Sequence, residues 1–177
     1  MLPCWPNGSM SVSSTARKCF MKIYKTYYQS DIGLIEIAGD EKELRSVDFV
    51  ETSEAPSSEV PTHLQECFRQ IEEYFQGKRR AFQLPLRLEG TDFQKKVWQE
   101  LMKIPFGKTT SYGEVAKAIG NEKAVRAVGQ ANHNNPISII VPCHRVIGRN
   151  GGLVGYGGGM YRKEWLLRHE ARCLADG

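Results

Sequence analysis

The feature that most restricts the fold is an apolar run, Ile-Ser-Ile-Ile-Val at residues 137–141, followed directly by Pro-Cys-His-Arg-Val at residues 142–146. A short run of β-branched residues is typical of a buried strand, so the chain is expected to fold around this segment. A thiol beside an imidazole is the pattern of an activated nucleophile, because a neighbouring base or cation lowers the pKa of a thiol. Neighbours in an extended chain point to opposite faces, so His144 would act on Cys143 through a water molecule.

Cys143 could instead have a purely structural role. A cysteine after an apolar strand is most often a small, buried core residue. A structural zinc site is not expected, because the five cysteines and four histidines include no Cys-x-x-Cys pair and no paired histidine spacing. An odd number of scattered cysteines favours reduced thiols and an intracellular protein.

Length and charge limit the class of protein. A chain of 177 residues, 41% hydrophobic and 25% charged, suits one globular domain or two small ones. Residues 1–20 lack the apolar core of a signal peptide and are expected to form a tail or leader outside the fold. Residues 1–90 carry 11 basic and 13 acidic side chains, whereas residues 91–177 carry 13 and 7. A basic second half favours a polyanionic partner, although this charge also lies in the range that keeps a small domain soluble.

The first half of the chain predicts a small α/β unit. Thr62 and Gln65 have the spacing of a capping box at a helix start, and Gly77 suits the end of that helix. The expected elements are strands over residues 22–28, 32–38, 44–50 and 82–86, and a helix over residues 62–75.

The second half predicts a helix-turn-helix. Capping boxes are expected where Thr91 precedes Gln94 and where Ser111 precedes Glu114. The second of these starts a short helix that Gly120 ends. The next helix, over residues 123–132, would then be capped by Asn121, and two short helices joined by a tight turn form the motif.

Arg126 is the one long side chain in the middle of that second helix, with Ala124, Ala127, Gly129 and Ala131 around it. Small residues allow a helix to approach a groove closely. They equally allow tight packing against another helix, with Arg126 in solvent. The residues alone leave both interpretations open.

A glycine-rich segment follows the Cys-His pair, with seven glycines among residues 148–159. This composition predicts a hairpin or wing, followed by a loop that lies close against a ligand. A flexible linker is the alternative, but the apolar residues within the segment favour order. A closing helix is expected from Met160 to about Leu174.

Residues 91–172 resemble the C-terminal domain of the 6-O-alkylguanine-DNA alkyltransferases. The matching segments are FQKKVWQELMKIPFGKTTSYGEVAKAIG, AVRAVGQANHNNP, IIVPCHRVIGRNGG, GYGGG and RKEWLLRHE. The N-terminal α/β unit fits the first domain of the family. The resemblance implies an α/β protein with a small ribonuclease-H-like domain over residues 21–88 and a C-terminal winged helix-turn-helix-like domain over residues 91–177.

The resemblance also implies a reaction: direct reversal of DNA damage, in which an alkylated guanine is flipped out of the duplex. Its alkyl group then passes irreversibly, once per protein molecule, to Cys143. His144 would activate the thiol through a water and Glu170 would orient the imidazole. Tyr112 would donate a proton to the leaving purine, and Asn135 would hold the segment that bears the nucleophile.

Further residues follow from the same resemblance. Arg126 corresponds to the arginine that fills the gap left by the flipped nucleotide, on a helix that enters the minor groove. The expected base pocket is lined by Val146, Val154, Tyr156 and Gly158, and the expected DNA surface adds Ser111, Ala124, Ala127, Gly129 and Gln130.

The expected partner is double-stranded DNA that contains an alkylated guanine, bound by a monomer without membrane contact; the 4-O position of thymine is a second candidate target. The cytoplasm is the expected location, or the nucleus in a eukaryote. No cofactor and no metal are expected, since Cys4 and Cys19 lack an accompanying histidine pair. Two rival hypotheses are a winged-helix regulator with a structural or redox-sensing cysteine, and a Cys-His hydrolase that turns over repeatedly.

Overall fold

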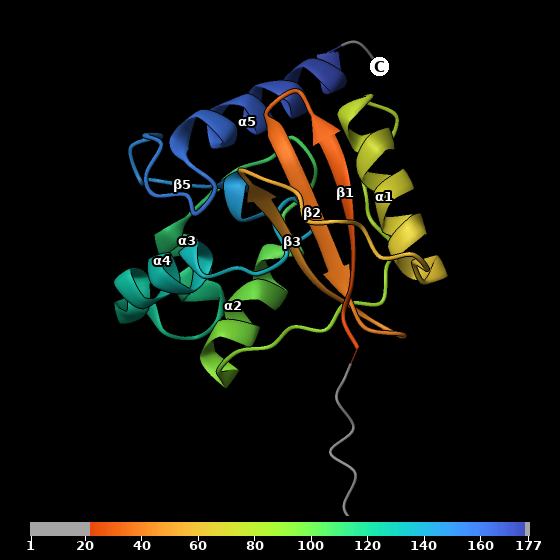
Figure 1. Ribbon diagram of the computed structural model, residues 1–177. Helices are drawn as coiled ribbons and strands as arrows, with labels where there is room; N and C mark the ends of the chain where they lie inside the picture. Colours follow the sequence, from red (N-terminus) through yellow and green to blue (C-terminus); the bar gives the residue numbers. More distant parts are fainter. Residues whose placement is uncertain (1–21, 176–177) are drawn as a thin grey trace, which may run out of the picture.

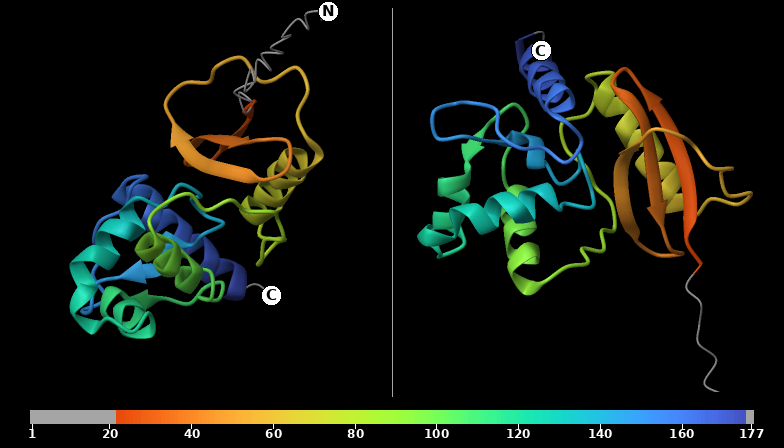
Figure 2. Two further views of the ribbon diagram at one scale, coloured as in Figure 1. Left: turned by 90° about the horizontal axis from the view of Figure 1, so that it is seen from below. Right: turned by 60° about the vertical axis from the view of Figure 1, so that its left-hand side comes forward.

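The computed structural model describes residues 22–175 as two lobes, which Figures 1 and 2 show from three sides. The first lobe is a three-stranded antiparallel sheet in the order β1-β2-β3, with helix α1 packed against it. Its elements are β1 (Tyr24–Ser30), β2 (Gly33–Gly39), β3 (Leu44–Val50) and α1 (Thr62–Phe75).

The alternation of side chains along the strands explains this lobe. Ile35 and Ile37 of β2 are fully buried, while Glu36 between them is partly exposed. Such alternation is expected of a sheet with one covered face. Since Ile37 pairs with Val47 and Glu36 pairs with Asp48, the register places Asp48 on the less buried face.

Two predictions in this lobe are wrong. Residues 82–86 form no strand, because the segment meets β3 at a single bridge between Leu44 and Leu86 and crosses toward the second lobe. Thr62 does not cap α1, because the carbonyl of Pro61 already accepts hydrogen bonds from the first turn and Thr62 is itself helical.

The predicted end of α1 is confirmed. Gly77 has a φ of 72°, a conformation that a residue without a side chain adopts at little cost. Its N–H donates to the carbonyl of Tyr74, and the N–H of Lys78 donates to the carbonyl of Glu73. This pair of bonds is the Schellman arrangement that satisfies the last carbonyls of a helix.

The second lobe contains three helices packed on one another, followed by the segment that contains Cys143 and by a closing helix (Figure 1). None of the helices that the structure describes is long and apolar enough to cross a membrane. The elements are α2 (Asp92–Leu101), β4 (Thr110–Ser111), α3 (Tyr112–Ala118), a 3-10 turn (Glu122–Ala124), α4 (Val125–His133), a second 3-10 turn (Cys143–Arg145), β5 (Val146–Ile147) and α5 (Met160–Ala175).

Local sequence accounts for most of the helix starts in this lobe. The capping boxes at Thr91 and Ser111 are both formed, with each side chain accepting from the third helical N–H. Asn121 makes no side-chain cap, contrary to expectation, because a 3-10 turn lies between it and α4. The glycine-rich segment forms a loop closed by Gly148 and Gly152, rather than a hairpin.

The apolar run before Cys143 is buried as predicted but is not a strand. Ile139 has a φ of 71°, which is rare for a β-branched residue, and the chain turns there. The N–H of Val141 donates to the carbonyl of Ile137, which closes the turn. The run therefore meets β3 at one bridge, between Val47 and Ile137, and then turns away from it.

Candidate active site

Cys143 opens the 3-10 turn that follows the buried run, and only 3% of the residue is exposed. The side-chain amide of Asn135 donates to its Sγ at 3.1 Å and to the carbonyl of Val141 at 2.9 Å. The side-chain amide of Asn132 donates to the carbonyl of Cys143 at 3.2 Å. The two asparagines thus hold both the sulfur and the backbone of this residue.

The thiol is protonated in the resting protein. Burial raises the pKa of Cys143 to about 11, although the hydrogen bond from Asn135 and the charge of Lys163 act in the opposite direction. The direction of this shift is opposite to the one expected from the neighbouring imidazole. Because the thiolate is the reactive form of a cysteine, a base would have to remove this proton for Cys143 to act as a nucleophile.

His144 lies next to Cys143 and is fully buried. Burial lowers its pKa, so the imidazole is neutral, and its Nε2 lies 2.9 Å from Oε1 of Glu170. A carboxylate accepts only, which assigns the ring proton to Nε2 and leaves Nδ1 as an acceptor. Within residues 22–175, Nδ1 has no hydrogen-bond partner.

Glu170 of α5 is the centre of a buried hydrogen-bond cluster. Arg145 donates Nη2–H to Oε1 at 2.9 Å and Nε–H to Oε2 at 3.0 Å. The hydroxyl of Tyr74 donates to Oε1 at 2.9 Å, and the backbone N–H of Gly107 donates to Oε2 at 2.7 Å. Burial raises the pKa of Glu170, but the hydrogen bonds from His144 and Arg145 outweigh it, so the group is a carboxylate with a lowered pKa.

Glu170 is not a surface charge that pairs with arginines of its own helix. Glu170 is fully buried, whereas Arg168 is exposed and pairs with Glu164. The partner of Glu170 is Arg145, which the sequence places next to the Cys-His pair.

Lys163 is a residue of this site that the sequence did not lead us to expect. It is fully buried, and its Nζ donates to the carbonyls of Val146 at 2.6 Å and Val154 at 3.0 Å. Burial lowers its pKa to about 8, and the nearby sulfur of Cys143 opposes that shift. Helical spacing could have found it, because Lys163 lies seven residues before Glu170 on one side of α5.

Tyr74 was also missed, and no signal in the sequence pointed to it. It belongs to α1 of the first lobe and reaches Glu170 across 96 positions of the chain. Only the packing of the two lobes brings the pair together.

A cavity of about 280 Å³ opens beside Cys143. Of the four residues expected in the base pocket, Tyr156 and Gly158 line this cavity. Val146 and Val154 do not, and instead direct their carbonyls to Lys163. The hydroxyl of Tyr112 donates to the carbonyl of Val154 at 2.8 Å, so Tyr112 lies against the glycine-rich loop.

The expected DNA-contacting residues lie apart from the cavity, on α3, α4 and the 3-10 turn between them. Arg126 lies in the first turn of α4 and is exposed. Ala127 and Gln130 of the same helix are exposed as well. Gly129 is partly buried, and a Cβ on it would lie 3.9 Å from the ring of Tyr112. Ser111 is used as the cap of α3, and Ala124 ends the 3-10 turn. Small residues therefore serve both packing and an open surface.

The site combines a buried thiol with an adjacent His–Glu–Arg cluster. An exposed helix-turn-helix lies in the same lobe. These features are those of a two-lobed protein that uses a cysteine for its chemistry and a helical surface for binding. Residues 92–172 match the family described as "6-O-methylguanine DNA methyltransferase, DNA binding domain", and residues 23–88 match its "ribonuclease-like domain". The chain belongs to this family, the methylated-DNA–protein-cysteine methyltransferases.

Individual relatives agree with this assignment. The methylated-DNA–protein-cysteine methyltransferase of Methanosarcina acetivorans is 51% identical over 156 residues, which cover 85% of this chain and all of that protein. The crystal structure of the Mycobacterium tuberculosis O6-methylguanine methyltransferase matches with 44% identity and a TM-score of 0.77, covering 85% of this chain and 94% of that one. A structure of the same mycobacterial protein in complex with DNA matches with a TM-score of 0.76 at 46% identity, covering 83% of this chain and 92% of that one.

Proposed function

We propose that Cys143 is the alkyl acceptor of this protein and that it reacts once. Membership of the family gives the reaction itself: direct-reversal DNA repair by transfer of an alkyl group from DNA to a cysteine. The observation that supports Cys143 is its place on the wall of the 280 Å³ cavity, beside the His144–Glu170 pair. By contrast, Cys67 is fully buried in the hydrophobic core of the first lobe.

The proposed proton path starts at the thiol. A water that bridges Sγ and Nδ1 of His144 would pass the thiol proton to the imidazole, since a buried ring nitrogen without a protein partner is expected to have a polar neighbour. Glu170 is held as a carboxylate and would stabilise the imidazolium that results. Arg145 keeps Glu170 anionic throughout, so that Glu170 orients His144 and does not remove its proton.

In the transfer step, the thiolate sulfur of Cys143 forms a bond to the alkyl carbon while the bond from that carbon to guanine O6 breaks. The bonding electrons pass to the guanine, whose ring takes up a proton. Tyr112 is proposed as the donor, because its hydroxyl lies at the glycine-rich loop that borders the site. Asn135 would hold the sulfur in place, and Tyr156 and Gly158 would contact the base from the cavity wall. The proposed part of Val146 and Val154 is limited to their backbone, which Lys163 holds beside the site.

On the DNA side, we propose that α4 enters the minor groove and that Arg126 takes the place of the flipped nucleotide. Its exposed position in the first turn of α4 supports this role. A second cavity of about 620 Å³, lined by residues that include Ser111, Tyr112 and Arg149, opens where α3 meets the glycine-rich loop. The remaining proposed contacts are Ser111, Ala124, Ala127, Gly129 and Gln130.

DNA is the partner of this family, and several further properties stay proposals. They are binding as a monomer, a location in the cytoplasm or a eukaryotic nucleus, domains over residues 21–88 and 91–177, and action without cofactor or metal. No metal-binding group of His, Cys, Asp and Glu occurs among residues 22–175. Cys4, Cys19 and the proposed tail over residues 1–20 lie outside the described residues.

The test is transfer from a duplex that carries a radiolabelled methyl group on guanine O6. Label is expected to reach the protein one-to-one and to be found on Cys143 by peptide mass spectrometry. Cys143→Ser should bind the duplex and accept no label. Cys173→Ser is the matched control and should accept label normally.

Three results would each contradict this proposal. Label on Cys67 or Cys173 would exclude Cys143 as the acceptor. Duplex binding without any transfer would favour the regulator, and repeated turnovers with methanol or another small product would favour the hydrolase.

A further inference from the structure

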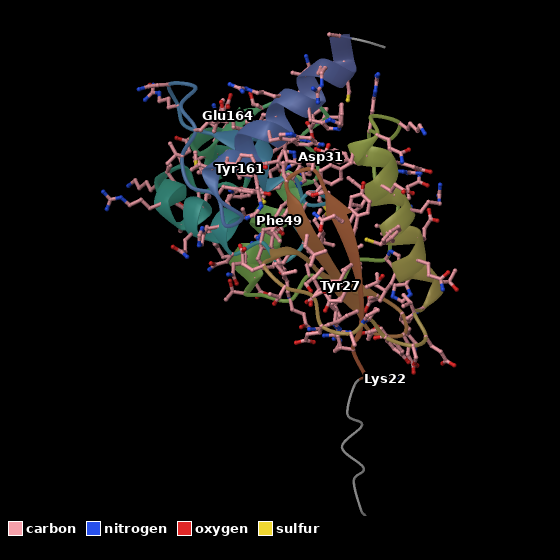
Figure 3. The ribbon with its side chains drawn as sticks, turned by 45° about the horizontal axis from the view of Figure 1, so that its top comes forward. Lys22, Tyr27, Asp31, Phe49, Tyr161 and Glu164 are labelled. Atoms are coloured by element: carbon pink, nitrogen blue, oxygen red, sulfur yellow. The ribbon has the colours of Figure 1, made fainter. Side chains whose placement is uncertain are left out.

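The cavity beside Cys143 is not built by the second lobe alone. Its lining comes from the end of α4 and the loop after it, from the nucleophile turn, from the glycine-rich loop, and from Asp48 and Phe49 of β3. Figure 3 shows Phe49 where the sheet of the first lobe meets the second lobe. The first lobe therefore supplies a carboxyl group to the space next to the acceptor sulfur.

Backbone hydrogen bonds fix this part of β3 against the nucleophile turn. The N–H of Val47 donates to the carbonyl of Pro136 at 3.0 Å, and the N–H of Ser138 donates to the carbonyl of Val47 at 2.9 Å. Asp48 is the next residue along β3. Its position at the cavity thus follows from strand pairing and not from a movable loop.

Asp48 has no neutralising partner. Among residues 22–175 it makes no hydrogen bond and no ion pair, and its side chain is solvent-accessible at the rim. Glu36 lies across from it on β2 and adds like charge, although Glu36 is itself paired with Nζ of Lys25 at 3.1 Å. Partial desolvation at the cavity rim, together with Glu36, raises the pKa of Asp48 to about 6.

Among residues 22–175, none of the other ionisable groups around the cavity forms an ion pair with Asp48. They are Cys143 and Tyr156 on its walls and His133 at the end of α4. Arg162 of α5 stacks on Phe49 at 4.6 Å, but its guanidinium donates to the carbonyls of Ile32 and Gly158. Lys163 donates its hydrogen bonds to the carbonyls of Val146 and Val154.

We propose that Asp48 is a specificity-determining residue that makes the pocket for the O6 substituent disfavour anionic substituents, such as carboxymethyl, relative to neutral ones of the same size. The inference rests on the proposed role of Cys143, since a substituent that reacts with Cys143 must occupy this cavity. Two carboxylates in one small, partly desolvated space repel each other, and each disfavours the charged form of the other.

The experiment compares single-turnover transfer from three duplexes, which carry O6-methylguanine, O6-carboxymethylguanine or O6-carbamoylmethylguanine. The carbamoylmethyl group matches carboxymethyl in size and lacks its charge. The wild-type protein is expected to prefer carbamoylmethyl over carboxymethyl, and Asp48→Asn should reduce that preference about 10-fold, the scale of a change of one pKa unit.

A pH series gives a second readout. The carboxymethyl group stays ionised above pH ~5, since ordinary carboxyl groups have pKa values near 4. Asp48 loses its charge as the pH falls through about 6. The preference of the wild-type protein should therefore decrease between pH ~8 and pH ~5, and that of Asp48→Asn should decrease less, because His133 on the cavity wall is present in both proteins.

Asp31→Asn is the matched control, because Asp31 is an exposed acid of the same lobe in the turn between β1 and β2 (Figure 3). It should leave the preference unchanged. If methyl transfer to Cys143 proceeds but Asp48→Asn has the wild-type preference, the inference is wrong and the proposed function stands. If no duplex transfers its group to Cys143, the proposed function fails and the inference fails with it.

Discussion

At the scale of single residues, Glu170 is the side chain that connects the candidate site. Its two oxygens accept hydrogen bonds from His144, Tyr74, Arg145 and Gly107, so the hydrogen-bonding capacity of the carboxylate is fully satisfied. A carboxylate with this many donors is rigid and stays ionised. The orientation of His144 depends on it, because a neutral imidazole has no other strong acceptor for its Nε2–H in the described part of the chain.

Glu170→Gln is expected to slow alkyl transfer by about 100-fold, on the scale of general-base contributions. The amide cannot stabilise an imidazolium as a carboxylate does. The measurement is the single-turnover rate at a temperature where near-UV circular dichroism shows the variant to be folded, since Arg145 would lose its charged partner. Glu164→Gln, on the exposed side of the same helix, is the control and should react at the wild-type rate.

The same variant gives a pH test of stability. The folded pKa of Glu170 is about 2, below the unfolded value of about 4.3, so its contribution is present above the unfolded pKa and is lost as the pH falls through the folded one. Denaturant unfolding of the wild-type protein should show this loss between pH ~5 and pH ~2. Glu170→Gln should have a lower free energy of unfolding at neutral pH, and this free energy should change less with pH in that window. An equally steep change would show that other carboxyl groups cause the loss of stability.

At the scale of elements, the sequence correctly predicted two helix caps in which both partners lie within three residues of each other. Thr91 and Ser111 form their capping boxes because the partner Gln or Glu is three residues away. Thr62 has the same spacing, but Pro61 precedes it and begins the helix one residue earlier. The two threonines thus form a natural pair for comparison.

Thr91→Ala is expected to destabilise the protein by about 1 kcal/mol, the usual effect of losing an N-cap side chain. Thr62→Ala should change stability by less than about 0.5 kcal/mol, because this side chain caps nothing. Urea unfolding at fixed pH measures both. Equal effects of the two variants would contradict the assigned caps.

Helix α4 carries the proposed DNA contact. Arg126→Ala is expected to slow transfer from a normally paired lesion more than from a mispaired one, because a filler of the helix gap matters most where the base is well stacked. A phosphate contact would instead weaken binding to methylated and normal DNA alike and reduce the salt slope by about one contact. Lys117→Ala, on α3, serves as the comparison for a surface cation.

At the scale of the whole molecule, the candidate site contains residues of both lobes and of the 3-10 turn that begins at Cys143. Asn135 binds the sulfur of Cys143 and, through Val141 and Ile137, the turn that is bridged to β3. An alkylated sulfur is bulkier and cannot become the anion that Asn135 is placed to hold. The effect of repair should therefore spread beyond the cavity.

Alkylation of Cys143 is expected to destabilise the protein by roughly 1–3 kcal/mol, the usual effect of overpacking by about one methylene. For a chain of this size, that corresponds to a fall in melting temperature of about 2–8 °C. Thermal melts before and after one equivalent of methylated duplex, with the DNA removed, measure the change. A melting temperature that is equal or higher after alkylation would refute the expectation; Cys143→Ser treated in the same way is the control.

The sequence by itself determined three of the four expected strands and most helix boundaries to within a residue or two, and it singled out Cys143, His144 and Glu170 as candidate site residues. These follow from alternation, helical spacing and capping, which act between residues close in the chain, and from a family pattern that is contiguous around residues 142–146.

Tertiary structure decided the rest. The apolar run before Cys143 was expected as a strand, but it turns at Ile139, because Ile137 is bridged to β3 and Asn135 holds the carbonyls on either side of the turn. The cluster of Tyr74, Arg145 and Glu170 and the charge of Asp48 at the cavity also depend on packing of the two lobes. Burial and charge at these positions are set by residues distant in the chain, which no local pattern encodes.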